Sequence, residues 1–182
     1  MAGGVGSRFW PASREDKPKQ YLDILGIGKS LIQMTYDRAI QLVPKENVLI
    51  ATNEKYRAIT KEHLPDLQDD QILCEPSRNN TAPCIAYAAL KLNQKDPNAV
   101  FAVLPSDHVI LKEDQYIKLM TEAFDFAKNN DALVTLGITP TRPDTGYGYI
   151  ESEGNELPLT VKAFKEKPDT ATAQKYLDSG NY

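Results

Sequence analysis

The sequence has little cysteine, no long apolar run and no excess of basic residues. Its two cysteines, Cys74 and Cys84, have neither the number nor the spacing of a disulfide framework or a zinc site, so we expect buried thiols in a reducing cytoplasm. No run of eighteen apolar residues occurs, and the N-terminus lacks the regions of a signal peptide, so we expect no membrane span. A net charge of −4 also disfavours a nucleic-acid partner.

What remains is an ordinary globular composition, with 41% hydrophobic and 25% charged residues in 182. Short apolar runs alternate with amphipathic stretches along the chain. The runs predict strands at 48–51, 72–74, 100–104 and 133–137. The stretches between them predict helices: one capped by Ser30, one over 54–64, one capped by Asn80 or Thr81, and one starting at Asp114. This alternation predicts an α/β fold that is Rossmann-like, with a mostly parallel sheet and helices on both faces.

The pattern changes after residue 137. A loop rich in proline and glycine over 139–148 precedes predicted strands at 149–151 and 160–165, and Asp169 or Thr170 caps a last helix ending near Gly180. A glycine loop that binds phosphate normally follows a strand, yet only two residues precede Gly3. We therefore expect a single domain over 1–182 that is truncated at both ends, lacking the first strand and elements after Tyr182.

Four polar clusters fall where ligands bind in such folds, beyond the carboxyl ends of the strands. They span 3–20, 75–83, 105–108 and 146–167. Their convergence on one edge of the sheet argues for a site more strongly than any single motif does.

The first cluster begins with Gly-Gly-Val-Gly-Ser-Arg at 3–8, which suits either a plain glycine turn or a phosphate loop. It is not a Walker A loop, and it lacks the third glycine of a dinucleotide fingerprint. Arg8 adds a planar donor fork for phosphate oxygens. Among the cations that follow in the chain, Lys19 is the best candidate for a ligand contact, because Pro18 restricts the backbone before it. Arg14 and Lys17 could equally be ordinary solvated surface residues.

Each of the other clusters also has a purely structural alternative. Residues 75–83 could simply cap a helix, and residues 145–150 could simply be a tight segment leading into a β-hairpin. Asp107, directly after a predicted strand, suits either a turn cap or a Mg²⁺ ligand, and its position at the strand end favours the metal. Residues 164–168 suit an exposed strand with salt bridges.

The motifs Gly-Gly-x-Gly-x-Arg-x-Trp-Pro-x-Ser-Arg at 3–14 and Pro-Lys-Gln at 18–20 resemble the signature of the mannose-1-phosphate guanylyltransferases, a family of sugar nucleotidyltransferases. Segments 75–83, 105–108, 145–150 and 164–168 are similar to further segments of that family, except that Asn79 stands where the family usually has arginine and Arg78 is its neighbour. The resemblance implies the nucleotide-diphospho-sugar transferase fold. It also implies catalytic roles for Arg8 and Lys19 and a metal role for Asp107. The nucleotide-binding set would be Gly3, Gly4, Gly6, Ser7, Glu75, Asn80 and Thr81, and the sugar-binding set Gly146, Gly148, Glu166 and Lys167.

The resemblance further implies a cytoplasmic enzyme that uses Mg²⁺ to make GDP-mannose and pyrophosphate from GTP and mannose 1-phosphate. The residues alone leave the base and sugar open, so transfer to another sugar, such as thymidylyl transfer to glucose 1-phosphate, stays an alternative. So does a nucleotide-sugar-binding regulatory module without turnover. A dinucleotide oxidoreductase is disfavoured because the third glycine and a clear ribose-binding acid are lacking. Homo-oligomer formation, a following isomerase domain, the second metal ligand and the activity of this stretch alone are left open.

Overall fold

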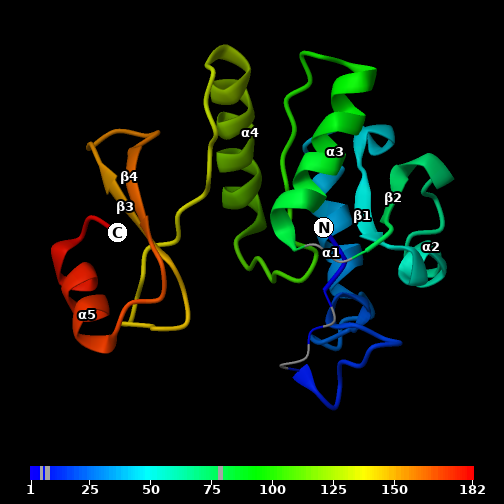
Figure 1. Cartoon of the computed structure of the whole chain (residues 1–182), viewed down its shortest axis with the longest axis horizontal. Helices are drawn as coiled ribbons and strands as arrows, with labels where there is room; N and C mark the ends of the chain where they lie inside the picture. The colour runs from blue at the N-terminus through cyan, green and yellow to red at the C-terminus, as the bar shows by residue number, and fades with distance from the viewer. Residues whose placement is uncertain (5, 7–8, 78–79) are drawn as a thin grey trace. The chain divides into compact units, whose positions relative to one another are not determined.

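A computed structural model describes residues 1–4, 6, 9–77 and 80–182. The chain forms two compact units, residues 1–133 and residues 134–182 (Figure 1). Ser7, Arg8, Arg78 and Asn79, all named by the sequence motifs, lie outside the described residues.

The first unit contains a parallel strand pair, β1 (Ile50–Asn53) and β2 (Ile72–Glu75), in register from Ile50↔Ile72 to Asn53↔Glu75. The 3₁₀ turn η4 (Glu54–Tyr56) and helix α2 (Arg57–His63) join the two strands, which is the expected βαβ connection. The N-terminus runs beside β1, where the Ala2 N–H donates to the Ala51 carbonyl at 2.7 Å (Figure 1).

Three longer helices complete this unit. They are α1 (Leu31–Ala39), α3 (Thr81–Lys95) and α4 (Glu113–Asn129), with short 3₁₀ turns at η2 (Lys19–Tyr21), η3 (Lys45–Asn47) and η5 (Asp69–Gln71). The predicted cap at Ser30 is confirmed, since its N–H donates to Gln33 Oε1 at 2.8 Å in a capping box. Helix α4 starts one residue before Asp114, so the predicted start was late by one position.

Two predicted strands were wrong, since residues 100–104 and 133–137 are not in strands. A strand forms only where a neighbour supplies ladder hydrogen bonds. Within the described residues, the backbone bonds near 100–104 lie at and just beyond the end of this run: Leu104 O accepts from the Met1 ammonium at 2.8 Å, and Ser106 N donates to Met1 O at 3.1 Å. Most side chains of the two runs are correspondingly exposed, including Phe101 and Leu133, whereas Leu104 is half-buried against the core.

Strand β1 begins two residues later than the predicted start at Val48. The reason is that Val48 already has other partners. Its N–H donates to Lys45 O at 3.2 Å in the η3 turn, and its carbonyl accepts from Gln71 Nε2 at 2.9 Å. Because these groups are occupied locally, they are not available to a strand ladder.

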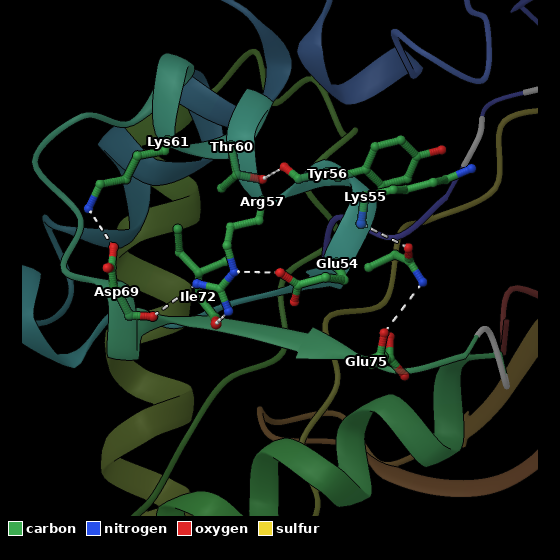
Figure 2. A network of polar contacts seen from close by, with 10 residues as sticks. Glu54, Lys55, Tyr56, Arg57, Thr60, Lys61, Asp69, Ile72 and Glu75 are labelled. Carbon is green, nitrogen blue, oxygen red and sulfur yellow. Dashed lines mark hydrogen bonds and ion pairs between the residues drawn. The ribbon is translucent and has the colours of Figure 1, made fainter.

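The core of this unit is built around Tyr21, Ile32, Tyr56, Leu67 and Ile72, which are all almost fully buried. A polar chain runs through it: Tyr21 Oη lies 2.8 Å from Thr60 Oγ1, which donates to the Tyr56 carbonyl at 2.8 Å. Outside the core, Arg57 reaches from α2 to Glu54 and to the carbonyls of Asp69 and Ile72, which ties the helix to the start of β2 (Figure 2).

The second unit pairs β3 (Tyr149–Glu153) with β4 (Thr160–Lys165) antiparallel, with an irregularity between Glu151 and Ser152. Helix α5 (Thr170–Ser179) follows. Asp169 caps it by accepting from Thr172 N at 2.7 Å, and Gly180 ends it at φ 71°. The two strands and the capped helix predicted for this region are confirmed, and β3 runs two residues beyond the predicted end at Glu151. No helix within the described ranges has the length and apolar composition to cross a bilayer.

We predict that Tyr21→Phe lowers the free energy of unfolding by about 1–2 kcal/mol, because it leaves buried Thr60 without one hydrogen-bond partner. Tyr87→Phe, at a half-buried position on α3, is the matched control and should change it by less than about 0.5 kcal/mol. Urea unfolding followed by circular dichroism measures both values. Equal effects in the two variants would contradict a structural role for the Tyr21 hydroxyl.

Candidate functional site

The glycine loop packs directly against the segment that carries Lys19. Gly6 has φ +63°, and a Cβ added to it would lie 2.6 Å from Lys19 Cβ and 2.8 Å from Ser13 Oγ. Gln20 Nε2 donates to the Ala2 carbonyl at 2.6 Å and to the Gly4 carbonyl at 2.9 Å. The glycines and the Pro-Lys-Gln motif, which the sequence linked only by resemblance, are therefore one structural element.

Lys19 and Asp107 meet at this element. Lys19 Nζ lies 2.9 Å from Asp107 Oδ2, with side-chain exposures of 20% and 40%, and 4.8 Å from the centroid of the Phe9 ring. Ser106, just before Asp107, is tied to Met1 O through both its N–H at 3.1 Å and its hydroxyl at 2.7 Å. The structure thus brings together the lysine and the carboxylate that the sequence placed in two separate motifs.

Glu75 belongs to the same group. It ends β2, where Asn53 Nδ2 donates to its carbonyl at 3.4 Å (Figure 2), and its Oε2 lies 3.9 Å from where a Cβ on Gly3 would stand. Cys84 on α3 is buried next to it. Burial, with the Glu75 carboxylate adjacent, raises the pKa of Cys84 to about 11, so this thiol stays protonated at neutral pH.

The start of α3 carries the two other predicted nucleotide contacts. Asn80 stands at the N-cap position but makes no side-chain capping bond, and its φ is +65°. Such a backbone conformation at a residue other than glycine costs roughly 1–3 kcal/mol, and residues of this kind cluster at functional sites. Thr81, the first helical residue, is exposed.

Asp107 suits a hard cation in its chemistry. Mg²⁺ takes oxygen ligands, keeps several waters and needs only one or two carboxylates beside the phosphates of its substrate. Among the residues that the structure describes, no group of three or more histidine, cysteine, aspartate or glutamate side chains is placed to hold a metal ion. Asp107 offers one carboxylate to a metal of this class, and its Oδ2 is engaged by Lys19 Nζ at 2.9 Å.

Three of the four predicted sugar-binding residues, Gly148, Glu166 and Lys167, lie together in the second unit, whereas Gly146 contacts Asp144. A Cβ on Gly148 would lie 3.4 Å from Lys165 O and 3.5 Å from Glu166 Oε2, and Glu166 pairs with Lys167. Gly146 N donates to Asp144 Oδ1 at 2.8 Å. This hydrogen bond is the main reason that the pKa of Asp144 lies below its usual value, and a hydrogen bond from Arg142 lowers it further. Lys167 has φ +34°, a second conformation that is rare outside glycine.

Sequence reasoning missed two residues of the first unit, Gln20 and Arg38, which bind the segments around Lys19 and Asp107. Gln20 could be found from its place in the Pro-Lys-Gln motif. The motif does not show, however, that its side chain donates hydrogen bonds to the backbone of the glycine loop. Arg38 belongs to no motif. Its signal is a charged residue three positions after Thr35 on the core-facing side of α1, where a solvated arginine does not belong.

These residues define the class of the protein: an α/β fold in which a lysine and the carboxylates of Asp107 and Glu75 gather around a glycine loop. Comparison with known families gives the particular one. The family model described as nucleotidyl transferase matches residues 1–182, and the chain belongs to the nucleotidyl transferase family.

Named relatives agree. The xanthan biosynthesis protein XanB of Xanthomonas campestris pv. campestris (strain B100) is 43% identical over 184 residues, covering 100% of this chain and 39% of XanB. Mannose-1-phosphate guanylyltransferase of Salmonella montevideo is 44% identical over 192 residues, covering 100% of this chain and 40% of that protein. The chain thus spans about two fifths of the length of these curated relatives, and the resemblance to guanylyltransferases drawn from the motifs is confirmed.

A solved structure supports the fold. The protein described as mannose-1-phosphate geranyltransferase from Thermus thermophilus superposes with a TM-score of 0.86 at 34% identity, covering 99% of this chain and 52% of that one. The predicted α/β nucleotidyltransferase fold is therefore confirmed.

We predict that Gly6→Ala destabilises the protein by about 1–3 kcal/mol. The new Cβ would collide with Lys19 Cβ, and the left-handed backbone disfavours alanine. Gly4→Ala is the matched control in the same loop, because a Cβ there meets nothing within 4 Å. Differential scanning fluorimetry and urea unfolding compare the two, and a Gly6→Ala variant as stable as Gly4→Ala would refute the close packing.

Proposed function

We propose that this chain forms part of the active site of an enzyme that converts GTP and mannose 1-phosphate into GDP-mannose and pyrophosphate. One observation carries the proposal: Lys19 and Asp107, from distant motifs, meet 2.9 Å apart beside the glycine loop. A cation and a carboxylate at such a loop suit a reaction in which triphosphate charge is neutralised. The names of the relatives supply the sugar and the base.

The reaction needs no nucleophilic side chain. A phosphate oxygen of mannose 1-phosphate attacks the α-phosphorus of GTP, and the bond from that phosphorus to the oxygen bridging to the β-phosphate breaks. Pyrophosphate leaves in line with the attack. Because the attacking oxygen is already an anion, little proton transfer is required, and catalysis is mainly positioning and charge neutralisation.

The first unit supplies groups for both tasks. Backbone N–H groups of the loop at Gly3, Gly4 and Gly6 are suited to phosphate oxygens. The hydrogen bond from Gln20 to the Gly4 carbonyl restricts how far the loop can move. Lys19 offers a positive charge that is already held in place by Asp107 and Phe9. Groups fixed before the reaction stabilise developing charge without reorganising during it.

The ion pair also defines how the site changes when substrate binds. Lys19 cannot neutralise a triphosphate while it neutralises Asp107, so we propose that phosphate oxygens replace the carboxylate at Lys19. Asp107 is then released as an oxygen ligand. Mg²⁺, when bound, would supply a second positive charge on the phosphates, with Asp107 as its protein ligand.

We assign the sugar to the second unit. Glu166 lies beside Gly148, a residue without a side chain to block approach, and its carboxylate suits hydrogen bonds from sugar hydroxyls. Lys167 pairs with Glu166 and suits the phosphate of mannose 1-phosphate.

Cys74 and Cys84 are free thiols, which suits the reducing cytoplasm that we propose as the location of the protein.

We predict that Lys19→Met and Asp107→Asn each lower kcat of the complete protein by about 10²–10³, the usual cost of losing one preorganised electrostatic contact. Lys95→Met is the matched control, since Lys95 is a well-exposed lysine paired with Asp70 at 3.6 Å, and it should turn over normally. Coupled detection of pyrophosphate release measures all three rates. Normal rates in the first two variants would remove Lys19 and Asp107 from the mechanism.

We predict that Glu166→Gln raises KM for mannose 1-phosphate roughly 10- to 100-fold, the worth of a hydrogen bond to a charged group, while KM for GTP stays unchanged. Glu156→Gln, on the exposed loop between β3 and β4, is the control. Initial rates with each substrate varied in turn give both constants. A rise in KM for GTP alone would place Glu166 at the nucleotide instead.

A panel with thymidine triphosphate and glucose 1-phosphate in the same assay checks which base and which sugar the enzyme uses.

A further inference from the structure

Arg38 is a charged side chain in the core of the first unit that the proposed reaction does not use. Its side chain is only 3% exposed. A guanidinium that leaves water must find hydrogen-bond acceptors, because an unpaired buried charge is strongly unfavourable. Arg38 finds three of them, one on its own helix and two at the ends of the stretch from residue 108 to residue 113.

The three acceptors show what Arg38 holds. Its Nη2 donates to Thr35 Oγ1 at 3.0 Å within α1 and to the backbone carbonyl of His108 at 3.1 Å. Its Nη1 donates to Glu113 Oε1 at 3.2 Å, at the start of α4. Arg38 thereby anchors both ends of the stretch from His108 to Glu113 to helix α1.

His108 directly follows Asp107, and this gives the anchor its consequence. On the other side of Asp107, Ser106 is fixed to Met1 by two hydrogen bonds. The backbone of Asp107 is therefore fastened on both sides, by Ser106 before it and by the Arg38 guanidinium after it. The carboxylate held between these two anchors is the one that lies 2.9 Å from Lys19.

We propose that Arg38 is a positioning residue: by binding the His108 carbonyl it fixes the Asp107 carboxylate where it pairs with Lys19. This proposal rests on the function proposed above for Asp107 and Lys19. The planar guanidinium suits the task, because its separate nitrogens Nη1 and Nη2 reach acceptors in different directions at fixed positions. The three donors of a lysine ammonium all diverge from one nitrogen atom. Because the Arg38 guanidinium is buried, it must keep these partners, and it thereby holds their positions.

The test measures the Lys19–Asp107 pair directly, without relying on turnover. Brief acylation with acetic anhydride, followed by peptide mass spectrometry, reports how fast each lysine of the folded protein reacts. Asp107→Asn sets the rate for a Lys19 released from its partner. We expect Arg38→Met to raise Lys19 acylation most of the way to that rate, while Lys61 and Lys95, which pair with Asp69 and Asp70, react as in the wild type.

Two further variants separate positioning from folding. Arg38→Lys keeps a buried positive charge and should give intermediate Lys19 acylation. Glu113→Gln keeps an oxygen that can accept from Arg38 and should leave Lys19 unchanged. In the complete protein we expect Arg38→Met to lower kcat per folded molecule by about 10- to 100-fold, the usual effect of a misplaced functional group. Arg38→Lys should lie between Arg38→Met and the wild type.

The outcomes distinguish this proposal from the proposed function. If the wild type forms GDP-mannose but Lys19 acylation and kcat in both Arg38 variants match the wild type, Arg38 does not position the pair. Faster acylation of every lysine would also overturn the proposal, since it would mean general loosening. If the Lys19 response is selective while the wild type makes no GDP-mannose, Arg38 holds the pair as proposed and the assigned reaction is wrong.

Discussion

The ion pair between Lys19 and Asp107 is the contact on which the rest of the site depends. It joins the N-terminal glycine loop to the turn that follows residues 100–104, two segments far apart in the sequence. Everything around it limits movement: Gly6 admits Lys19 because it has no side chain, Gln20 straps the loop, and Ser106 and Arg38 fasten the backbone on either side of Asp107. The pair also sets an order of events, because the lysine must exchange its carboxylate for phosphate before it can serve the reaction.

Unusual backbone conformations mark the same places. Gly6 and Asn80 in the first unit and Lys167 in the second all have positive φ. Only glycine adopts this conformation without cost, so at Asn80 and Lys167 the surrounding structure must hold a residue in a disfavoured state. Both residues lie in segments that the motifs had assigned to nucleotide or sugar. The local strain and the motifs are independent lines of support for the same assignment.

Much of this could be predicted from the sequence because it depends on local signals. The helix caps at Ser30 and Asp169, the two strands β3 and β4 and the βαβ unit of β1, α2 and β2 all follow from short-range patterns. Residues 100–104 and 133–137 have the composition of buried strands, but a strand also needs partners, and composition cannot show where these are. In the same way, motifs identified Lys19 and Asp107, whereas Arg38 lies in an ordinary helix and gains its meaning only from what it touches across the fold.

The central claim is that an oxygen of mannose 1-phosphate becomes bonded to the α-phosphorus of GTP at a centre formed by Lys19 and Asp107, and an isotope experiment tests this bond formation most directly. Mannose 1-phosphate labelled with ¹⁸O in its non-bridging phosphate oxygens is incubated with GTP, Mg²⁺ and the complete protein, and the products are followed by ³¹P NMR. The account predicts GDP-mannose with ¹⁸O in the oxygen that bridges its two phosphorus atoms, together with an equal amount of unlabelled pyrophosphate. Label in the pyrophosphate, or GTP that stays intact in the presence of bound sugar phosphate, would contradict it.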